Sequence, residues 1–311
     1  MCTIAKPGLQ RRIAHQRSVS HVHDAQRPLV SVLTPSFNQA AWLTDNLRSV
    51  ECQTYPHIEH VIMDGGSTDG SIEILKGAGE KVRWYSESDE GQSDAINKAF
   101  VRSRGEIIGW LNSDDAYFDC SVVEDAVAYF EAHPEVSVIY GHALQTTSDG
   151  AAIQVLWVPP FDRELLGALD FIVQPAAFIR RSALSEPMLD QSFHFGMDYE
   201  LWLRLSERSC RFERISRFVA IDRHQPERKS STMKDTYREN LQRLGEMYAM
   251  NLSDEWEKVR TSYYVRQRLM GALLIPRVRG PYAFSTPDGM KRGLLRRQTF
   301  QRRSTWPQEY R

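Results

Sequence analysis

LVSVLTPSFNQAAWLTDNLRSV (29–50), followed by IEHVIMD (58–64), determines the fold class of this chain. Residues 29–35 form a largely apolar run of the length that is typical of a buried strand. Residues 39–53 then carry apolar side chains at helical spacing, and 58–64 is a second apolar run. The chain therefore begins a repeated order of strand, helix and strand, which favours parallel strands covered by helices.

The same order continues toward the middle of the chain and then loosens. Strand, helix and strand in succession predict a mainly parallel, Rossmann-like central sheet with helices on both faces. Further strands are predicted at 82–87, 106–112, 136–141, 174–181 and 212–222, and helices at 71–78, 92–103, 121–132, 198–208 and 233–248.

Composition is that of an ordinary globular protein. The 311 residues are 41% hydrophobic and 25% charged, which suits one large domain or a domain with an appendage. No apolar run approaches the ~20 residues of a membrane span, and the first 27 residues lack the apolar core of a secretory signal. Four scattered cysteines, without a CxxC pair, predict neither a zinc site nor a disulfide framework and fit a reducing cytosol.

The net charge is −1, but the charged residues are distributed unevenly along the chain. Residues 1–27 carry a balance of +4 and residues 261–311 a balance of +9, so residues 28–260 carry −14. An acidic body with basic ends is not the charge pattern of a nucleic-acid-binding domain, and no nucleic-acid partner is predicted. The basic ends are either solvated tails or, at 261–311, a surface for an anionic membrane. The predicted location is cytoplasmic, with peripheral membrane contact as a hypothesis.

Acidic and polar residues follow four successive predicted strands. Because the carboxyl ends of parallel strands meet at one edge of a sheet, these residues are expected to converge there. Converging carboxylates repel one another unless a cation intervenes, and hard oxygen ligands suit Mg²⁺ or Mn²⁺ holding a diphosphate. Neither GxGxxG nor GxxxxGK[ST] is present, which excludes the usual dinucleotide and P-loop signatures. The four segments are TPSFN (34–38), DGGSTDG (64–70), ESDEGQSD (87–94) and NSDD (112–115).

These segments, in this order, resemble the successive blocks of family 2 glycosyltransferases over about residues 29–230. The resemblance implies the GT-A fold and a nucleotide-activated sugar as donor. It also implies a GT-A domain at 28–231, with a nucleotide-binding half at 28–118 and an acceptor half at 119–231. A basic tail at 1–27 precedes this domain, and a helical, basic C-terminal extension at 232–311 follows it.

The resemblance also implies a nucleotide-sugar site. The carboxylates of Asp64 and Asp94 would bind the base or ribose, and Gly91 would let the backbone pass close to the nucleotide. Lys98 would balance phosphate charge or else be a solvated helix lysine. The positions assigned to nucleotide-sugar binding are Thr34, Pro35, Asn38, Asp64, Gly91, Asp94, Lys98, Asn112 and Ser113.

Residues 112–115 occupy the place of the family's DxD motif, with asparagine in place of the first acid. Asn112 retains a carbonyl but contributes no charge, so contact with ribose rather than metal is expected. Asp114 would be the principal metal ligand. Asp115 would lie beside the metal, order the loop, or cap the following helix. His224, in a late loop, is a further candidate ligand for Mn²⁺, Mg²⁺ or phosphate, with Arg228 or Lys229 as a phosphate clamp.

Asp198 stands where the family's catalytic base lies, at the mouth of an amphipathic helix. Inverting transfer needs one base to deprotonate the acceptor hydroxyl as it attacks the anomeric carbon. Met197 replaces the acid that commonly precedes this base. Capping of the helix is the structural alternative for Asp198, and both roles are compatible.

The predicted function is inverting transfer of a sugar, of the hexosyltransferase type, from a nucleotide-diphosphate sugar to a hydroxyl of a glycan or lipid-linked acceptor. Polysaccharide, glycolipid or other cell-surface glycan synthesis is the expected setting. Asn112 and Met197 motivate an alternative, a catalytically inactive nucleotide-sugar binder or scaffold. A nucleotidyltransferase is disfavoured, because a glycine-rich, lysine-bearing first loop is missing.

Overall fold

The computed structural model describes residues 27–225, 234–248, 250 and 254–274. The predicted phosphate clamp at Arg228 and Lys229 lies outside the described residues, as do 1–26 of the basic tail and 275–311 of the extension.

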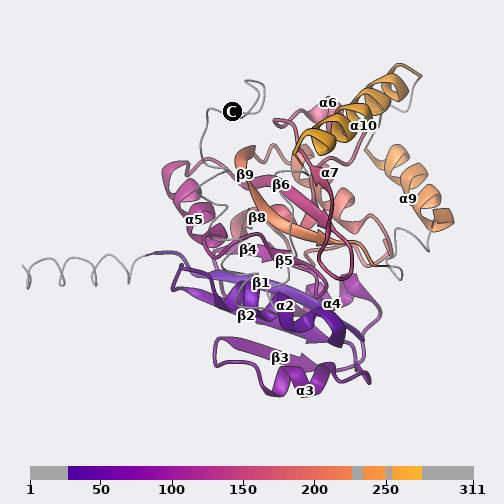
Figure 1. The fold of residues 1–311 in the computed structure, drawn as a ribbon. Coiled ribbons are helices and arrows are strands. Elements are labelled where there is room, and N and C mark those ends of the chain that lie inside the picture. The colour runs from indigo at the N-terminus through magenta and orange to yellow at the C-terminus, as the bar shows by residue number, and fades with distance from the viewer. Residues whose placement is uncertain (1–26, 226–233, 249, 251–253, 275–311) are drawn as a thin grey trace, which may run out of the picture.

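Nine strands of the described chain form one sheet in the order β3-β2-β1-β4-β8-β6-β9-β5, with β7 paired to β6 (Figure 1). The half built from β3, β2, β1 and β4 is parallel. Beyond β4 the sheet is mixed, since β8 is antiparallel to both β4 and β6 while β9 is parallel to β6. The bounds are β1 Val30–Ser36, β2 Ile58–Asp64, β3 Val82–Ser86, β4 Ile107–Trp110, β5 Ala116–Tyr117, β6 Val138–Thr146, β7 Ala152–Leu156, β8 Ala177–Arg180 and β9 Phe212–Arg223.

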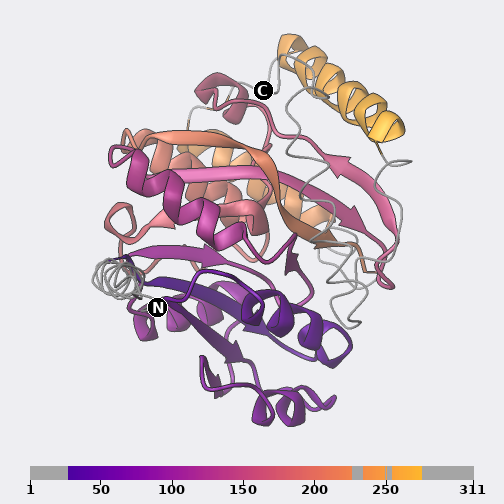
Figure 2. The same ribbon diagram turned by 60° about the vertical axis from the view of Figure 1, so that its left-hand side comes forward.

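Helices cover both faces of the sheet, which confirms the predicted fold class (Figures 1 and 2). Side chains of β1 alternate between the faces: Val30 and Val32 pack with α5, and Leu33 packs with α4 and α7. The helices are α2 Ala40–Glu51, α3 Ser71–Lys76, α4 Gln92–Arg102, α5 Val122–Ala132, α6 Arg163–Leu166, α7 Met197–Glu207, α9 Lys234–Met247 and α10 Asp254–Leu274, with short 3-10 turns η1 Gln174–Ala176 and η2 Arg181–Ala183.

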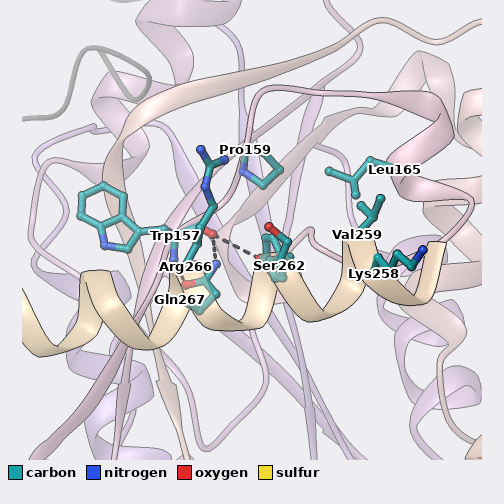
Figure 3. Close-up of a pocket in the computed structure, with 9 residues that line it drawn as sticks. Trp157, Pro159, Leu165, Lys258, Val259, Ser262, Arg266 and Gln267 are labelled. Atoms are coloured by element: carbon teal, nitrogen blue, oxygen red, sulfur yellow. Dashed lines mark hydrogen bonds between the residues drawn. The ribbon is translucent and has the colours of Figure 1, made fainter. Parts of the chain in front are cut away.

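α10 is fastened to the backbone of the segment that follows β7 (Figure 3). The side-chain carbonyl of Gln267 accepts a hydrogen bond from the Trp157 amide at 2.9 Å, and its NH₂ group donates to the Trp157 carbonyl. Tyr263 donates to the same carbonyl at 3.2 Å. These bonds place one face of α10 beside the ends of the sheet strands. None of the helices that the structure describes combines the length and apolar character needed to cross a membrane.

The expectation that the cysteines form no disulfide is wrong for two of the four. Cys52, at the end of α2, forms a disulfide with Cys120, which precedes α5, and the two Cα atoms lie 5.2 Å apart. The Thr54 amide donates to the Cys120 carbonyl at 2.7 Å and holds the same two segments together. This pair could not be predicted from the spacing of the cysteines, because 68 residues separate its members. Cys210 is a free thiol.

Candidate active site

A cleft of about 1110 Å³ opens at the carboxyl ends of β1 and β4. One wall comes from the loop after β1 and the start of α4, and the floor from the loop after β4. The opposite wall comes from the start of α7, the segment before η1 and one face of α10. The cleft therefore joins the parallel half of the sheet to the mixed half.

Of the thirteen predicted site residues, eight line this cleft and five lie outside its lining. The five outside are Thr34, Asn38, Asp64, Asp94 and Lys98. The eight that line the cleft are Pro35, Gly91, Asn112, Ser113, Asp114, Asp115, Asp198 and His224.

Asp64, at the end of β2, organises the loop that follows it. Its side chain is almost fully buried and accepts hydrogen bonds from the Gly66 and Ser67 amides at 3.0 and 2.9 Å. The hydroxyls of Ser67 and Ser86 donate to it as well, at 2.5 and 2.8 Å. Four donors occupy both carboxylate oxygens, so the loop after β2 is built around this side chain.

Thr34 and Asn38 connect loops to one another. The buried Thr34 hydroxyl donates to the Leu111 carbonyl at 2.8 Å and thereby joins the ends of β1 and β4. Asn38 has a left-handed φ of 53°, a conformation that asparagine tolerates better than most residues. Its side-chain oxygen accepts from the Thr68 amide at 2.9 Å. The loops after β1 and β2 are thus joined at the edge of the cleft.

Asp94 and Lys98 form an ion pair of 2.9 Å on successive turns of α4. Burial works against the charge of Asp94, but the hydrogen bonds from Lys98 and from the Glu90 amide hold the pKa of Asp94 below its ordinary value. Lys98 also donates to the Ser88 carbonyl at 3.0 Å. The pair therefore fastens α4 to the loop after β3 and lies outside the cleft lining.

Asn112 is the centre of a hydrogen-bond network on the cleft floor. Its oxygen accepts from Gln92 at 2.8 Å and from the Trp110 indole at 2.9 Å. Its NH₂ group donates to Gln174 at 2.8 Å and to Asp115 at 3.2 Å. The amide both accepts and donates here, whereas a carboxylate would supply acceptors alone. This network explains why asparagine occupies the first position of the DxD-like segment.

We predict that Asn112→Asp lowers the free energy of unfolding at pH 7 by about 1–3 kcal/mol, the cost of leaving buried polar groups unpaired. The new carboxylate would lose both donated bonds and would face Asp115. Urea denaturation measures the change. Gln242→Glu makes the same charge change at an exposed position and should stay within about 0.5 kcal/mol of the parent. Unchanged stability in Asn112→Asp would contradict the bracing role.

Asp115 and Arg223 hold the floor loop from beneath. The carboxylate of Asp115 is 4% exposed and accepts from the Arg223 amide at 3.0 Å. The Arg223 guanidinium is equally buried, donates to the Asp114 carbonyl at 3.0 Å and pairs with Asp45 of α2 at 2.9 Å. Asp115 therefore orders the loop, and it does not cap α5, whose N-cap is Ser121.

Asp114 and His224 are two of the predicted cation ligands, and both line the cleft. The half-buried Asp114 carboxylate accepts from Gln225 at 3.0 Å, and the exposed His224 lies next to Gln225 in sequence. In the part of the chain that the structure describes, no three His, Cys, Asp or Glu side chains are grouped as a metal site. A divalent cation bound at Asp114 would therefore take most of its ligands from a bound diphosphate or water.

Asp198 lies in the first turn of α7, directly behind the cap. Gly196 caps the helix with a left-handed φ of 74°, which suits glycine. Met197 is buried in the core, and this packing accounts for an apolar residue before Asp198. The helix N-terminus favours a negative charge at Asp198, and the side chain lines the cleft.

Sequence reasoning did not single out three other acids of the lining, Asp89, Asp170 and Asp222. Asp89 lies two residues before Gly91 and accepts a hydrogen bond from its amide at 2.9 Å, so its place in the DEG segment could have identified it. Asp170 carries no local motif. Only the packing of its segment against α7 and α10 brings it to the cleft.

The fold and the cleft together define a glycosyltransferase of the GT-A type. Residues 31–186, half of the chain, match the sequence family described as glycosyl transferase family 2. The chain belongs to this family, and both the predicted family and the predicted enzyme class are confirmed.

Similar proteins include the O-antigen biosynthesis protein RfbC of Myxococcus xanthus, 30% identical over 66% of this chain but only 16% of that protein. An uncharacterized glycosyltransferase of Mycobacterium tuberculosis is 31% identical over 57% of this chain and 68% of its own length. The chondroitin synthase of Pasteurella multocida is 30% identical over 60% of this chain and 20% of its own.

Two solved structures share the fold. S. aureus TarS 1–349, in complex with UDP-GlcNAc, superposes with a TM-score of 0.56 at 18% identity and covers 68% of this chain and 64% of TarS. The mannosyltransferase PcManGT of Pyrobaculum calidifontis, in complex with GDP-Man and Mn²⁺, gives 0.55 at 16% identity, over 85% and 79% of the two chains. At these identities the likeness concerns the fold alone.

Proposed function

We propose that this glycosyltransferase is inverting and transfers a sugar from a nucleotide-diphosphate sugar to a hydroxyl of a glycan or lipid-linked acceptor in polysaccharide or cell-surface glycan synthesis. One observation carries the proposal: a single cleft contains both the Asp114 loop at the end of β4 and Asp198 at the start of α7. An acid that can bind a cation and an acid that can take a proton are the two groups that this reaction needs.

The donor nucleotide occupies the wall formed by the loops after β1 and β3. Phe37, 59% exposed, offers an aromatic surface there, and Asp89 offers a carboxylate. Gly65, in the loop after β2, permits the close approach of the loop after β3, because a Cβ atom at this position would lie 2.7 Å from the Asp89 carboxylate. Complexes of TarS with UDP-GlcNAc and of PcManGT with GDP-Man support a nucleotide sugar as the donor class.

Asp114, with His224, would hold Mn²⁺ or Mg²⁺ together with the donor diphosphate. Such a cation supplies charge neutralisation for a departing diphosphate. Asp115 is unsuited to this role, because it is committed to the Arg223 amide and to Asn112. The contribution of the chain is to hold Asp114 still, through the Gln225 side chain and through the guanidinium of Arg223 on the Asp114 carbonyl.

Asp198 acts on the acceptor side. The acceptor oxygen attacks the anomeric carbon from the face opposite the diphosphate and inverts its configuration. The acceptor O–H bond breaks as its proton passes to the Asp198 carboxylate. The bond between the anomeric carbon and the phosphate oxygen breaks with its electron pair, and the nucleoside diphosphate leaves. The cleft supplies the positioning of the two substrates that makes this attack effectively intramolecular.

α10 lies at the acceptor end of the cleft and supports the proposed contact with an anionic membrane surface at the cytoplasmic face. Tyr264 and Gln267 of this helix line the cleft. On its outer side, Val265 and Leu269 are 51% and 60% exposed. An exposed apolar face on a basic segment suits the interfacial region of a membrane and would bring a lipid-linked acceptor close to Asp198.

The experiment combines binding and turnover with the full chain. UDP-GlcNAc, UDP-glucose, UDP-galactose and GDP-mannose are tested with MnCl₂ or EDTA, first by thermal shift and then by release of nucleoside diphosphate in the presence of alkyl glycosides. At least one donor should raise Tm with Mn²⁺ but not with EDTA, and should be turned over. Binding without turnover across the panel would indicate the inactive binder instead. Absence of binding would refute the donor class.

We predict that Asp114→Asn lowers the metal-dependent rate about a hundredfold or more, the scale of losing one group that stabilises developing charge. Asp149→Asn, at an exposed hairpin position, is the matched control and should keep the parent rate. The rate of nucleoside diphosphate release under saturating Mn²⁺ measures the effect. Full activity in Asp114→Asn would remove this residue from the cation site.

A further inference from the structure

Asp170 is a second acid on the acceptor side of the cleft. It lies in the segment between α6 and η1 and lines the same cleft as Asp198. Its carboxyl accepts from the Ile172 amide, and its Oδ1 atom is buried with no hydrogen-bond partner among the described residues. A buried carboxyl oxygen without a partner is costly and is uncommon unless a ligand or a function accounts for it.

The surroundings of Asp170 oppose a negative charge. Asp198 of α7 is the neighbouring charge, and Tyr264 faces the carboxyl from α10. Arg260 of α10 donates to the Ala168 carbonyl at 3.3 Å and is paired with Glu257. Burial, and then the charge of Asp198, raise the pKa of Asp170 well above its ordinary value. Burial and that neighbouring charge therefore favour the neutral, protonated form of the Asp170 carboxyl.

We propose that Asp170 binds the acceptor together with Asp198. The neutral Asp170 carboxyl donates its O–H to one acceptor oxygen, and the Asp198 carboxylate takes the proton of the attacking hydroxyl on the adjacent carbon. Asp170 keeps its own proton throughout, so the proton and bond balance of the transfer is unchanged. This assignment rests on the proposed glycosyl transfer.

The pair selects the chemical class of the acceptor. Two neighbouring oxygens, one accepting and one giving up a proton, are present in the vicinal hydroxyls of a sugar. A phosphate oxygen would bring a further negative charge close to the carboxyl groups of Asp198 and Asp170 and would be disfavoured. The structure thus assigns the end of a glycan, and not a lipid phosphate, to the position beside Asp198.

Kinetics of two variants test the assignment, with alkyl glycosides and octyl phosphate as acceptor probes. Asp170→Ala should raise the acceptor KM about tenfold or more, the effect of losing one buried hydrogen bond, and leave hydrolysis of the donor by water within about twofold. Asp170→Asn still donates a hydrogen bond and should keep KM within about threefold. Glu164→Gln, exposed on α6, should match the parent.

The outcomes distinguish a failure of the proposed role of Asp170 from a failure of the proposed glycosyl transfer. Activity that is unchanged in both Asp170 variants, or preferred transfer to octyl phosphate, would overturn the role of Asp170 while leaving the glycosyltransferase intact. Absence of transfer and of donor hydrolysis with every donor would overturn the proposed function and this inference with it.

The pH profile adds a measurement that a merely structural residue would not change. As pH rises through the raised pKa of Asp170, the carboxyl loses the proton it donates, so kcat/KM for the acceptor should fall. Asp170→Asn cannot lose this proton and should lack that fall. A parent-like alkaline fall in Asp170→Asn would overturn the assignment.

The pH dependence of the free energy of unfolding tests the raised pKa of Asp170 without any substrate. Between the ordinary pKa of aspartate and the raised pKa in the folded protein, the folded chain keeps a proton that the unfolded chain has released. As pH rises across this range, the folding equilibrium constant of the parent should therefore fall by up to about tenfold per pH unit relative to that of Asp170→Asn. Parallel curves for the two proteins would show that Asp170 is ionised and cannot donate.

Discussion

Asp198→Asn is expected to lower kcat for sugar transfer by about 10²–10⁴-fold, the range that one general base contributes. The amide keeps the size of the carboxylate but cannot take the acceptor proton. Asp198 is half-buried in the first turn of α7, where the helix N-terminus favours a negative charge. Single-turnover transfer with radiolabelled donor measures the chemical step directly.

Donor binding and stability should change little in this variant, because the proposed role of Asp198 is toward the acceptor and not the nucleotide. The KM for the donor should remain within about threefold, and the stability loss should be about 0.3–1 kcal/mol, the contribution of a charge at a helix N-terminus. Glu207→Gln, at the far end of the same helix, should leave kcat unchanged. A parent-like kcat in Asp198→Asn would move the base to another acid, with Asp170 the first to be tested.

Arg223→Met should lower the free energy of unfolding by about 3–5 kcal/mol, the cost of removing one partner of a buried ion pair. Arg223 is 3% exposed and is 2.9 Å from Asp45, which is nearly as buried. The variant leaves the Asp45 carboxylate without its ion-pair partner. It also removes the hydrogen-bond donors to the carbonyls of Asp114 and Ser148. Chemical denaturation at pH 7 gives the value.

The cost of the stranded charge can be separated from the cost of the lost hydrogen bonds. Adding Asp45→Leu to Arg223→Met removes both charges and should recover a large part of the stability, since a buried pair can be replaced by apolar residues at little cost. Arg211→Met, which breaks an exposed ion pair with Glu213, should cost less than about 1 kcal/mol. Equal losses at Arg223 and Arg211 would show that the inner pair is not buried in solution.

Local patterns made the fold class and much of the cleft predictable. The alternation of apolar runs with amphipathic segments placed β1, β2, β4 and their following helices close to their observed positions. Asn112 and Asp114 reach the cleft because they follow a strand of the parallel half, whose ends share one edge. Asp198 could be predicted because it stands where the family's catalytic base lies, at the start of a helix.

The hydrogen-bond partners of several of these side chains could not be predicted. Asp64 and Asp94 carry the residue types of a ligand site, yet their oxygens are engaged by the loops around them. The same carboxylate chemistry serves a nucleotide or a loop amide equally well. Which of the two it meets depends on where neighbouring backbone lies, and residue type does not contain that information.

The sequence by itself determined the order of most strands and helices and the acids at the strand ends, because these depend on periodicity and on neighbours within a few residues. The GT-A class followed from the resemblance of four segments to family 2 glycosyltransferases. Only the tertiary structure decided that Cys52 pairs with Cys120, that the Arg223 guanidinium binds the Asp114 carbonyl and that Asp170 lines the same cleft as Asp198. Each of these contacts joins segments far apart in the chain. Such segments meet through the packing of whole helices and strands, and no short pattern records that packing.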